Sequence, residues 1–238
     1  STEVLALEEL PKSLTIIGGG VIGMEIAFIY NALGCDVSVV EFLPRVLSML
    51  DPDVSDVVCQ SAIERGIKIY ESAKATSIRA TLGQTFVTEI EVEDQAHLIS
   101  SEKVLMAVGR RANLDALDLS KLKVELNERS NGIAVNEHMQ TSNENIYAIG
   151  DVTNIIQLAH VASHQGMIAA EHIAGQDRKM LYDLVPSTIF TMPEVGTVGL
   201  NEVTVQAEGR SITVVKFPFM AWGKAGAMHA TEGIVKLI

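Results

Sequence analysis

The chain has 238 residues and a formal net charge of −12 at pH 7, with 30 acidic against 18 basic side chains. This charge argues against nucleic acid and anionic membrane surfaces as partners, because both need clustered lysine and arginine. No apolar stretch approaches the roughly 18 residues of a membrane-spanning helix, and the start lacks the charged-then-apolar order of a signal peptide. We therefore expect small molecules and proteins as partners, in the cytoplasm.

The first predicted strand, residues 14–18, runs into a glycine-rich turn and then a helical pattern at 22–33. Gly18, Gly20 and Gly23 have the G-x-G-x-x-G spacing of a dinucleotide site. The first glycine permits the tight turn, the second lets the backbone approach a pyrophosphate, and the third lets the helix pack closely on the strand. The helix N-terminus then presents free N–H groups to the anion. The alternative is a glycine turn without a ligand, in any parallel α/β sheet.

The second predicted strand, residues 36–41, ends in an acidic side chain, Glu41. It follows the glycines by about 20 residues, where a carboxylate accepts hydrogen bonds from the ribose hydroxyls of a dinucleotide. A 2′-phosphate on that ribose would meet carboxylate repulsion. The pattern therefore favours NAD over NADP.

The pattern continues with a helix at 54–65 and a strand at 67–70, which predicts a doubly wound, Rossmann-like parallel sheet. The runs AKATSIRA, TFVTEIEVED and the start of AHLISSEKVLMAV show partial alternation and charged ends, so we expect an antiparallel excursion there. A buried strand at 104–108 returns to the sheet.

Beyond residue 113, IYAIGD predicts a short strand that ends in Gly150 and Asp151, and a helix is expected at 158–174, ending before Gly175. The runs VPSTIF, VGTVGL, SITVVKFPF and GIVKLI predict strands of a separate antiparallel layer. We divide the chain into three domains, residues 1–113, 114–184 and 185–238.

Cysteine and histidine usage gives no further site. Cys35 and Cys59 form neither C-x-x-C nor another close pair, so we expect two reduced cysteines, which suits a cytosolic compartment. His160, His164 and His172 have helical spacing, but no acidic or cysteine partner completes a tetrahedral set. No metal site is predicted.

Five motifs in order carry a family resemblance: the opening LEELPKSLTIIGGGVIGMEIA, then AVGRRAN, IYAIGDV, QLAHVA and STIFTMPEVGTVG. This succession resembles the flavin-dependent pyridine nucleotide-disulfide oxidoreductases, and within them the dihydrolipoamide dehydrogenases most of all. The resemblance implies an NAD-binding domain at 1–113, the C-terminal half of an FAD-binding domain at 114–184, and the beginning of an α+β dimerisation domain at 185–238. Ala112, Gln157, Val161 and Met192 depart from the usual family residues.

The resemblance also implies two sets of cofactor-binding residues. The NAD set is Gly18, Gly19, Gly20, Val21, Ile22, Gly23 and Glu25 at the pyrophosphate, Glu41 at the ribose, Ala75 at the adenine and Gly109 near the nicotinamide. The FAD set is Gly150 and Asp151 at the ribityl chain, with Gln157, Leu158, Ala159 and His160 along the isoalloxazine. Glu25 has a further implied role in pairing with a flavin-side lysine, although a glutamate that complements the helix dipole explains it equally well.

For function, the resemblance implies an NAD-dependent oxidoreductase that converts dihydrolipoamide and NAD⁺ to lipoamide and NADH through FAD and a redox disulfide. The family's cysteine pair, with four residues between, and its His–Glu acid/base pair are absent from this sequence. We therefore expect a fragment of a longer enzyme, with no catalytic residue and no activity of its own.

Several alternatives stay open. One is a related flavoprotein, such as an NADH oxidase or a mercuric, CoA-disulfide or glutathione reductase, and another is a non-catalytic nucleotide-binding module. The implied partners are NAD(H), a second copy in a homodimer, and the acyltransferase core of a 2-oxo acid dehydrogenase complex.

Overall fold

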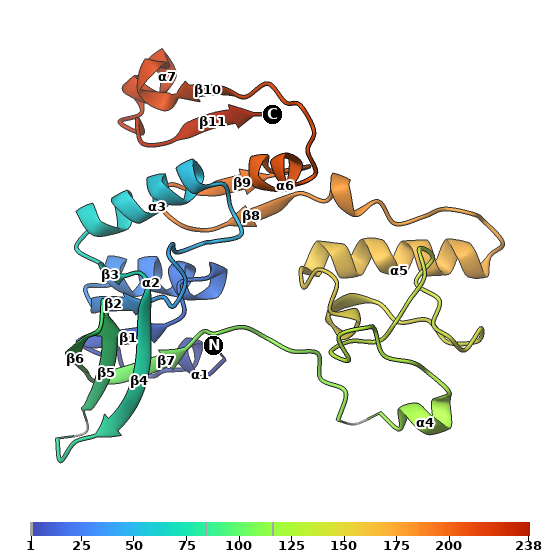
Figure 1. Cartoon of the computed structure of the whole chain (residues 1–238), viewed down its shortest axis with the longest axis horizontal. Helices are drawn as coiled ribbons and strands as arrows, with labels where there is room; N and C mark the ends of the chain where they lie inside the picture. Colours follow the sequence, from blue (N-terminus) through green and yellow to red (C-terminus); the bar gives the residue numbers. More distant parts are fainter. Residues whose placement is uncertain (1, 84, 116) are drawn as a thin grey trace. The chain divides into compact units, whose positions relative to one another are not determined.

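A computed structural model describes residues 2–83, 85–115 and 117–238 (Figure 1). The chain forms two compact units: residues up to Gly109 together with Pro186–Ile238 form the first, and Arg110–Val185 form the second. Within the described ranges, no helix is long and apolar enough to cross a membrane.

The first unit is built on a parallel sheet in the strand order β3-β2-β1-β7. Its strands are β1 (Ser13–Ile17), β2 (Asp36–Val40), β3 (Lys68–Tyr70) and β7 (Lys103–Met106), and its long helices are α2 (Val21–Ala32) and α3 (Pro52–Glu64). All three strand pairs are parallel, with Leu14 of β1 facing Val37 and Lys103 in register. A short helix, α1 (Thr2–Leu5), is tied to α2 by the Tyr30 hydroxyl, which donates to the Val4 carbonyl at 2.6 Å. The predicted Rossmann-like sheet is confirmed.

The two faces of this sheet have different covers. One face carries Leu14, Ile16, Val37 and Val39, which are buried in one core with side chains of α2 and α3. The opposite face is covered by an antiparallel meander of β4 (Ala73–Ala80), β5 (Phe86–Val92) and β6 (Gln95–Ser101). The predicted antiparallel excursion is therefore confirmed. A meander can replace a crossover helix here because antiparallel strands need only short turns between them.

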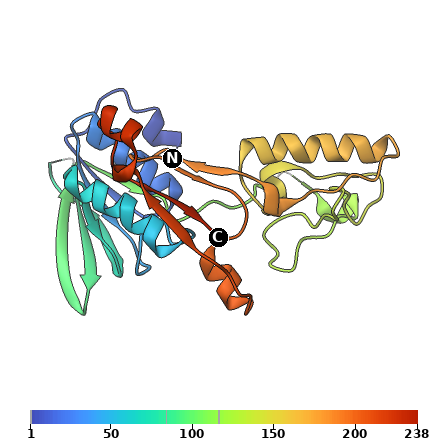
Figure 2. The same cartoon turned by 90° about the horizontal axis from the view of Figure 1, so that it is seen from above.

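The C-terminal segment packs on the first unit. Its elements are β8 (Ser187–Ile189), β9 (Val195–Thr197), α6 (Glu202–Ala207), β10 (Val215–Pro218), η3 (Phe219–Ala221), α7 (Gly223–Ala227) and β11 (Ile234–Leu237). The four predicted strands are present as two antiparallel pairs, β8–β9 and β10–β11, and the short helices between them were not predicted. Ile189 and Val195 are buried in the same core as α2 and α3. In both views β11 lies beside α3 (Figures 1 and 2).

A buried ion network ties this segment to the sheet unit. The Lys236 side chain is 6% exposed, and its Nζ lies 2.9 Å from Asp51 Oδ2, 2.9 Å from Asp53 Oδ1 and 2.7 Å from Glu202 Oε2. Asp51 also accepts the N–H groups of Glu202 and Val203. Three elements therefore meet at one ammonium group: the start of α3, the start of α6, and β11.

The charges in this network support one another. Burial alone would raise the pKa of Asp51, but the hydrogen bonds from Lys236 and from two backbone N–H groups outweigh it and lower that pKa. The pKa of Asp53 is lowered in the same way, with burial opposed by Lys216 and Lys236. Burial works against the charge of Lys236, but its three carboxylates outweigh burial and raise its pKa.

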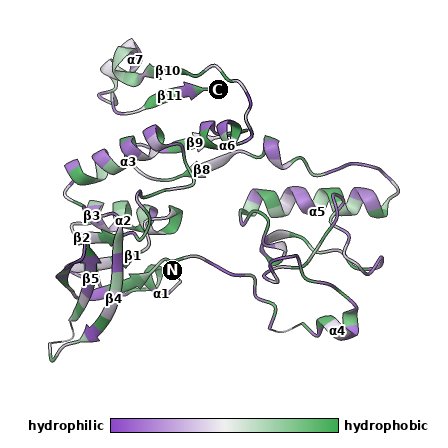
Figure 3. Ribbon diagram, viewed as in Figure 1, coloured by the Kyte–Doolittle hydropathy of each residue, from purple (hydrophilic) through white to green (hydrophobic). Residues whose placement is uncertain are grey.

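The second unit is mostly irregular around one long helix. It contains α4 (Leu119–Leu122), η1 (Gly150–Thr153), α5 (Ala159–Ile173) and η2 (Tyr182–Leu184). Helix α5 matches the predicted helix to within one residue at each end, and hydrophilic and hydrophobic stretches alternate along it (Figure 3). Its apolar side packs with Met139 and Met180 in a small core.

The predicted strand IYAIGD is wrong. Tyr147 forms an isolated bridge with Gln140, and the backbone then turns into η1 at Gly150, whose φ is +74°. The apolar run is buried without forming a sheet strand, since Ala148 packs in a small core with Val124 and Ile133. An apolar run of this length does not by itself distinguish a strand from another buried segment.

The Lys236 network leads to a stability prediction. Replacing Lys236 by methionine should destabilise the fold by about 3 kcal/mol at neutral pH, because buried carboxylates lose their cation. In the wild type, the folded-state pKa values of Asp51 and Asp53 lie below the unfolded value of about 3.9, so the network stabilises the fold above that pH and is lost as pH falls through the folded values. In the variant, acid should reduce carboxylate repulsion instead. Urea unfolding at neutral pH and at a pH below about 3.9 measures both effects.

Lys216→Met is the matched control for this experiment. Lys216 pairs with the same Asp53, but its side chain is 49% exposed. Its loss should cost less than about 1 kcal/mol, as for other exposed ion pairs. Equal losses in the two variants would show that burial does not set the strength of this network.

Candidate functional site

The glycine turn lies between β1 and α2, at the edge of the sheet where the parallel strands end. Gly18 has a φ of +108°, and a Cβ there would meet the Ala107 carbonyl oxygen at 2.5 Å. A Cβ on Gly23 would overlap the Gly18 carbonyl oxygen. The backbone itself therefore requires glycine at both positions, one for the turn and one for the close approach of α2.

Gly20 differs from these two glycines. No atom of the described chain lies within 4 Å of a Cβ built on Gly20, and its φ of −74° suits any residue. It is the N-cap of α2, and none of the described side chains caps the helix there. Val21 and Ile22 begin α2 and pack against the core. Folding therefore gives no reason for glycine at this position, whereas a ligand lying against the turn would give one.

Glu41 lies directly against the glycine turn. It follows β2, is 9% exposed, and accepts the Gly19 N–H at 2.6 Å through Oε2 and the Leu43 N–H at 2.7 Å through Oε1. A carboxylate oxygen has two acceptor positions, so each oxygen retains one for a further donor. The carboxylate joins the glycine turn to the loop that follows β2, while part of its hydrogen-bonding capacity remains unused.

The loop after β2 is held to the turn by further bonds. The Leu47 N–H donates to the Gly19 carbonyl at 2.8 Å, so both polar backbone groups of Gly19 are bound within the protein. The neighbouring Val46 N–H donates to Glu71 Oε1 at 2.7 Å, and the Ser55 hydroxyl donates to the Val46 carbonyl at 2.6 Å. Sequence reasoning missed Glu71, although it follows β3 and the ends of neighbouring parallel strands share one edge.

The other residues of the predicted NAD set lie in the same unit. Ala75 lies on β4 at a register shift, two residues after Ala73, whose N–H donates to the Glu41 carbonyl. Gly109 follows β7 with a φ of +123°, two residues after the Ala107 carbonyl that borders Gly18. Glu25, on α2, accepts the Phe190 N–H at 2.9 Å, so its carboxylate contacts the segment around β8.

The second unit holds the predicted flavin residues around a second glycine turn. Gly150 begins η1, its N–H donates to Gln165 Oε1 at 2.6 Å, and the Thr153 hydroxyl donates back to the Gly150 carbonyl at 2.9 Å. Gln165 is fully buried on α5 and also donates to the Tyr182 hydroxyl at 2.9 Å. Asp151 is exposed on this turn. The turn is therefore rigidly held while its carboxylate faces solvent.

The start of α5 lies beside this turn, because η1 and α5 contact each other. Leu158 is the N-cap and has no capping side chain among the described residues, and Ala159 and His160 form the exposed first turn. The first N–H groups of a helix have no partner within the helix. Gln157 precedes them and donates to Asn154 Oδ1 at 2.9 Å. The second unit thus combines exposed helix N–H groups with an exposed carboxylate.

The cysteines have no catalytic geometry. Both are free; Cys35 is buried, and Cys59 lies 4.0 Å from Glu71 Oε1. Burial, with nearby carboxylates, raises the pKa of each thiol to about 11. The thiolate, which is the nucleophilic form, is therefore scarce at neutral pH.

The histidines with helical spacing make different contacts in the structure. His164 Nε2 lies 3.2 Å from an Arg178 guanidinium nitrogen, whereas His172 Nδ1 is 2.7 Å from the Tyr147 hydroxyl. Within the described part of the chain, no three His, Cys, Asp or Glu side chains are grouped so that they could hold a metal ion.

Comparisons with known proteins agree with this arrangement. The family profile "Pyridine nucleotide-disulphide oxidoreductase" matches residues 1–166, and the profile of its dimerisation domain matches residues 185–238. Dihydrolipoyl dehydrogenase of Chlamydia muridarum is 41% identical over 238 residues, 100% of this chain and 50% of that protein. The protein of the same name from Bacillus subtilis is 39% identical over 241 residues, with the same coverage. The chain therefore spans about half the length of the curated relatives it matches.

Solved structures share the fold along nearly the whole chain. LpdA from Mycobacterium tuberculosis superposes with a TM-score of 0.86 at 31% identity, covering 97% of this chain and 49% of that one. The Cu(II) complex of the HOCl-induced flavoprotein disulfide reductase RclA from Escherichia coli also gives 0.86, at 28% identity, covering 99% of this chain and 52% of that one.

Substitution of the glycines of the turn should lower the stability of the fold by different amounts. Gly23→Ala should destabilise the fold by about 3 kcal/mol, because the added Cβ forces α2 away from the turn. Gly20→Ala should change stability by less than about 1 kcal/mol, because its Cβ points into open space. Denaturant unfolding of both variants measures the difference. Equal destabilisation by the two substitutions would contradict the conclusion that the fold requires Gly23 but does not require Gly20.

Proposed function

This chain belongs to the pyridine nucleotide-disulphide oxidoreductase family, and we propose that it is the NAD-binding part of a dihydrolipoyl dehydrogenase. The whole protein would convert dihydrolipoamide and NAD⁺ to lipoamide and NADH. The observation that carries the proposal is the pairing of Gly20, which has open space around it, with Glu41 beside the same turn. FAD and a redox disulfide would supply the electron transfer between thiols and NAD.

The residues of the first unit would bind and orient NAD. Residues 18–25 would receive the pyrophosphate, with the first N–H groups of α2 as donors and Gly20 as the point of close approach. Ala75 would contact the adenine, and Gly109 would lie towards the nicotinamide. Glu25 would then support the turn through α2 and its bond from Phe190.

Glu41 would select between the two nicotinamide coenzymes. Its carboxylate is held in place by Gly19 and Leu43, so it cannot swing away from a phosphate on the adenosine ribose without breaking two charge-assisted hydrogen bonds. Its remaining acceptor positions suit ribose hydroxyls. A fixed negative charge that accepts hydrogen bonds supports NAD over NADP.

The second unit would hold part of FAD. Asp151 would accept a ribityl hydroxyl, and the turn before it is kept in place by Gln165. Gln157, Leu158, Ala159 and His160 would lie along the isoalloxazine, where the α5 dipole favours negative charge. Residues 1–113, 114–184 and 185–238 would then be the NAD domain, the C-terminal half of the FAD domain and the beginning of the dimerisation domain.

The redox disulfide and its partners belong to the whole protein in this proposal. Cys35 and Cys59 lack the required spacing and lie in separate elements, so neither serves as the disulfide. The match of residues 185–238 to a dimerisation domain supports a homodimer. The acyltransferase core of a 2-oxo acid dehydrogenase complex would be the partner, in the cytoplasm.

A coenzyme titration tests the role of Glu41. The chain should bind NADH in preference to NADPH, and Glu41→Gln should reduce that preference about tenfold, or about 1.4 kcal/mol. The ratio of the two dissociation constants is the decisive readout, because a disturbed turn would weaken both coenzymes alike. Tighter binding of NADPH by the wild type would refute the assignment.

A second titration tests the glycine turn. Gly20→Val should abolish detectable NADH binding while the chain remains folded, because the side chain fills the space intended for the pyrophosphate. Gly196→Val is the matched control: Gly196, on β9, also has no atom of the described chain within 4 Å of an added Cβ. Nucleotide fluorescence follows both titrations. Unchanged affinity in Gly20→Val would place the coenzyme elsewhere.

A further inference from the structure

The sheet of the first unit has a polar half on one face. On that face, the residues nearest the strand ends are apolar: Ile17 and Val40 are buried with Ala73 and Ile90 of the meander. The residues nearer the strand starts are polar: Ser13 and Thr15 on β1, Asp36 and Ser38 on β2, and Lys68 on β3. Parallel strands covered on both faces are normally continuous apolar runs, so this alternation is unexpected.

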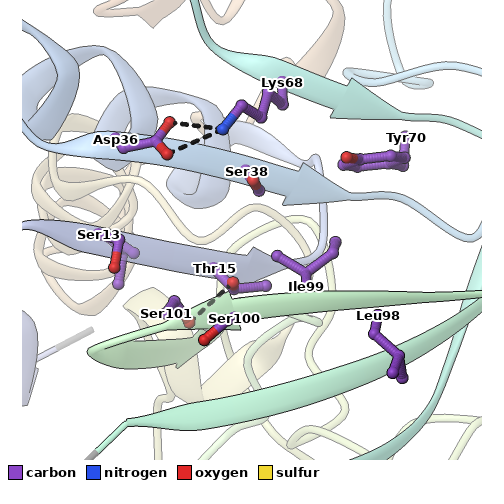
Figure 4. A pocket seen from close by; sticks show the side chains of 11 residues that line it. Ser13, Thr15, Asp36, Ser38, Lys68, Tyr70, Leu98, Ile99, Ser100 and Ser101 are labelled. Carbon is purple, nitrogen blue, oxygen red and sulfur yellow. Dashed lines mark hydrogen bonds and ion pairs between the residues drawn. The ribbon is translucent and has the colours of Figure 1, made fainter.

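These polar side chains line a cavity of about 230 Å³ between the sheet and β6. Figure 4 shows Thr15 and Ser38 on neighbouring strands, with Ser100 and Ser101 of β6 next to Thr15. Thr15 Oγ1 donates to Ser101 Oγ at 2.9 Å, and Ser101 donates onward to the Lys103 carbonyl at 2.8 Å. One wall of the cavity is therefore an ordered chain of hydroxyl groups.

Ser38 is the unexplained member of this wall. It is 6% exposed, lines the cavity, and stands in register between Thr15 and Lys68. Its hydroxyl forms no hydrogen bond with any described residue. Buried hydroxyls are almost always hydrogen-bonded in folded proteins. Ser38 Oγ, unlike the enclosed and unpartnered Thr88 Oγ1, is accessible from the cavity, where a water or a ligand hydroxyl can bond to it.

The charges around the cavity restrict the chemistry of that group. Lys68 Nζ binds both Asp36 carboxylate oxygens, at 3.0 and 2.8 Å, so the cation and the anion at the cavity neutralise each other. The other polar groups are hydroxyls, which both donate and accept. Leu98 and Ile99 of β6 add apolar surface. Neutral donor–acceptor groups next to apolar walls match a small, uncharged molecule that carries hydroxyls on a carbon chain.

We propose that the cavity lined by Thr15, Ser38 and Ser101 is a binding site for a neutral polyol of about three to five carbons, a size that fits the cavity volume given about 30 Å³ for each water-sized group. One ligand hydroxyl donates to or accepts from Ser38, and a second takes the remaining acceptor position of Thr15. The carbon chain lies along Leu98 and Ile99.

This site is separate from the coenzyme site. Ser13, Asp36 and Lys68 are the first residues of their strands, whereas the glycine turn and Glu41 follow the last residues of β1 and β2. The two sites lie at opposite ends of the same strands. Occupation of one can therefore be measured without occupation of the other, and the polyol site does not depend on the proposed function.

Amide NMR spectra of the full 238-residue chain test this proposal, with erythritol as the probe. The amides of β1, β2, β3 and β6 around the cavity should shift and saturate as erythritol is added. 1-Butanol is the matched probe, because it has the same chain length but a single hydroxyl that cannot reach both Ser38 and Thr15, and it should give no saturable shift. Shifts that rise linearly with erythritol would mean that water alone fills the cavity, which overturns the proposal.

Two variants complete the experiment. Ser38→Ala and Thr15→Val remove one hydroxyl each without adding volume, and each should abolish the saturable shift. Ser163→Ala, at an exposed serine on α5, is the control and should retain it. Unchanged amide shifts outside these strands show that the variants are folded. Saturation that persists in a folded Ser38→Ala chain would also overturn the proposal.

Discussion

The site depends on one carboxylate that holds two loops together. Glu41 accepts the N–H groups of Gly19 and Leu43. The Leu47 N–H donates to the Gly19 carbonyl, which adds a second hydrogen bond between the same loop and the glycine turn. Hydrogen bonds to a charged acceptor are worth about 1.5–3 kcal/mol each, more than a neutral pair. The glycine turn is thereby fixed before any ligand binds, so the conformational entropy of ordering it is lost during folding and not during binding.

The three glycines of the turn have different roles: two are needed for folding, and the third leaves space for a ligand. Gly18 and Gly23 are required by backbone atoms that lie too close for a Cβ, whereas the space around Gly20 is open. A sequence motif treats all three alike. The structure distinguishes them, because a position that folding leaves unconstrained is one where the choice of glycine needs a reason outside the chain.

The order of strands and helices in the first unit could be predicted from the sequence, because buried runs and helical periodicity are local signals. The motif also located the glycine turn and Glu41, since both follow strands at one edge of a parallel sheet. Glu71 and Gln165 could not be found in this way. Each acts through a single backbone N–H of a distant loop, Val46 in one case and Gly150 in the other, and a long-range bond of this kind leaves no spacing pattern.

The wrong strand at IYAIGD and the polar cavity have a common physical origin. In both places tertiary contacts decide what a short run of residues does: Gly150 turns because Gln165 accepts its N–H, and Ser38 is buried because the meander covers its face of the sheet. Burial of a hydroxyl is tolerated when a partner is present. The polar residues within β1 (SLTII) and β2 (DVSVV) therefore point to tertiary contacts that a hydropathy pattern does not predict. A serine placed inside an otherwise apolar strand is a position where a hydrogen-bond partner is to be sought, and for Ser38 the hydroxyl reaches a cavity in which a water or a ligand can be that partner.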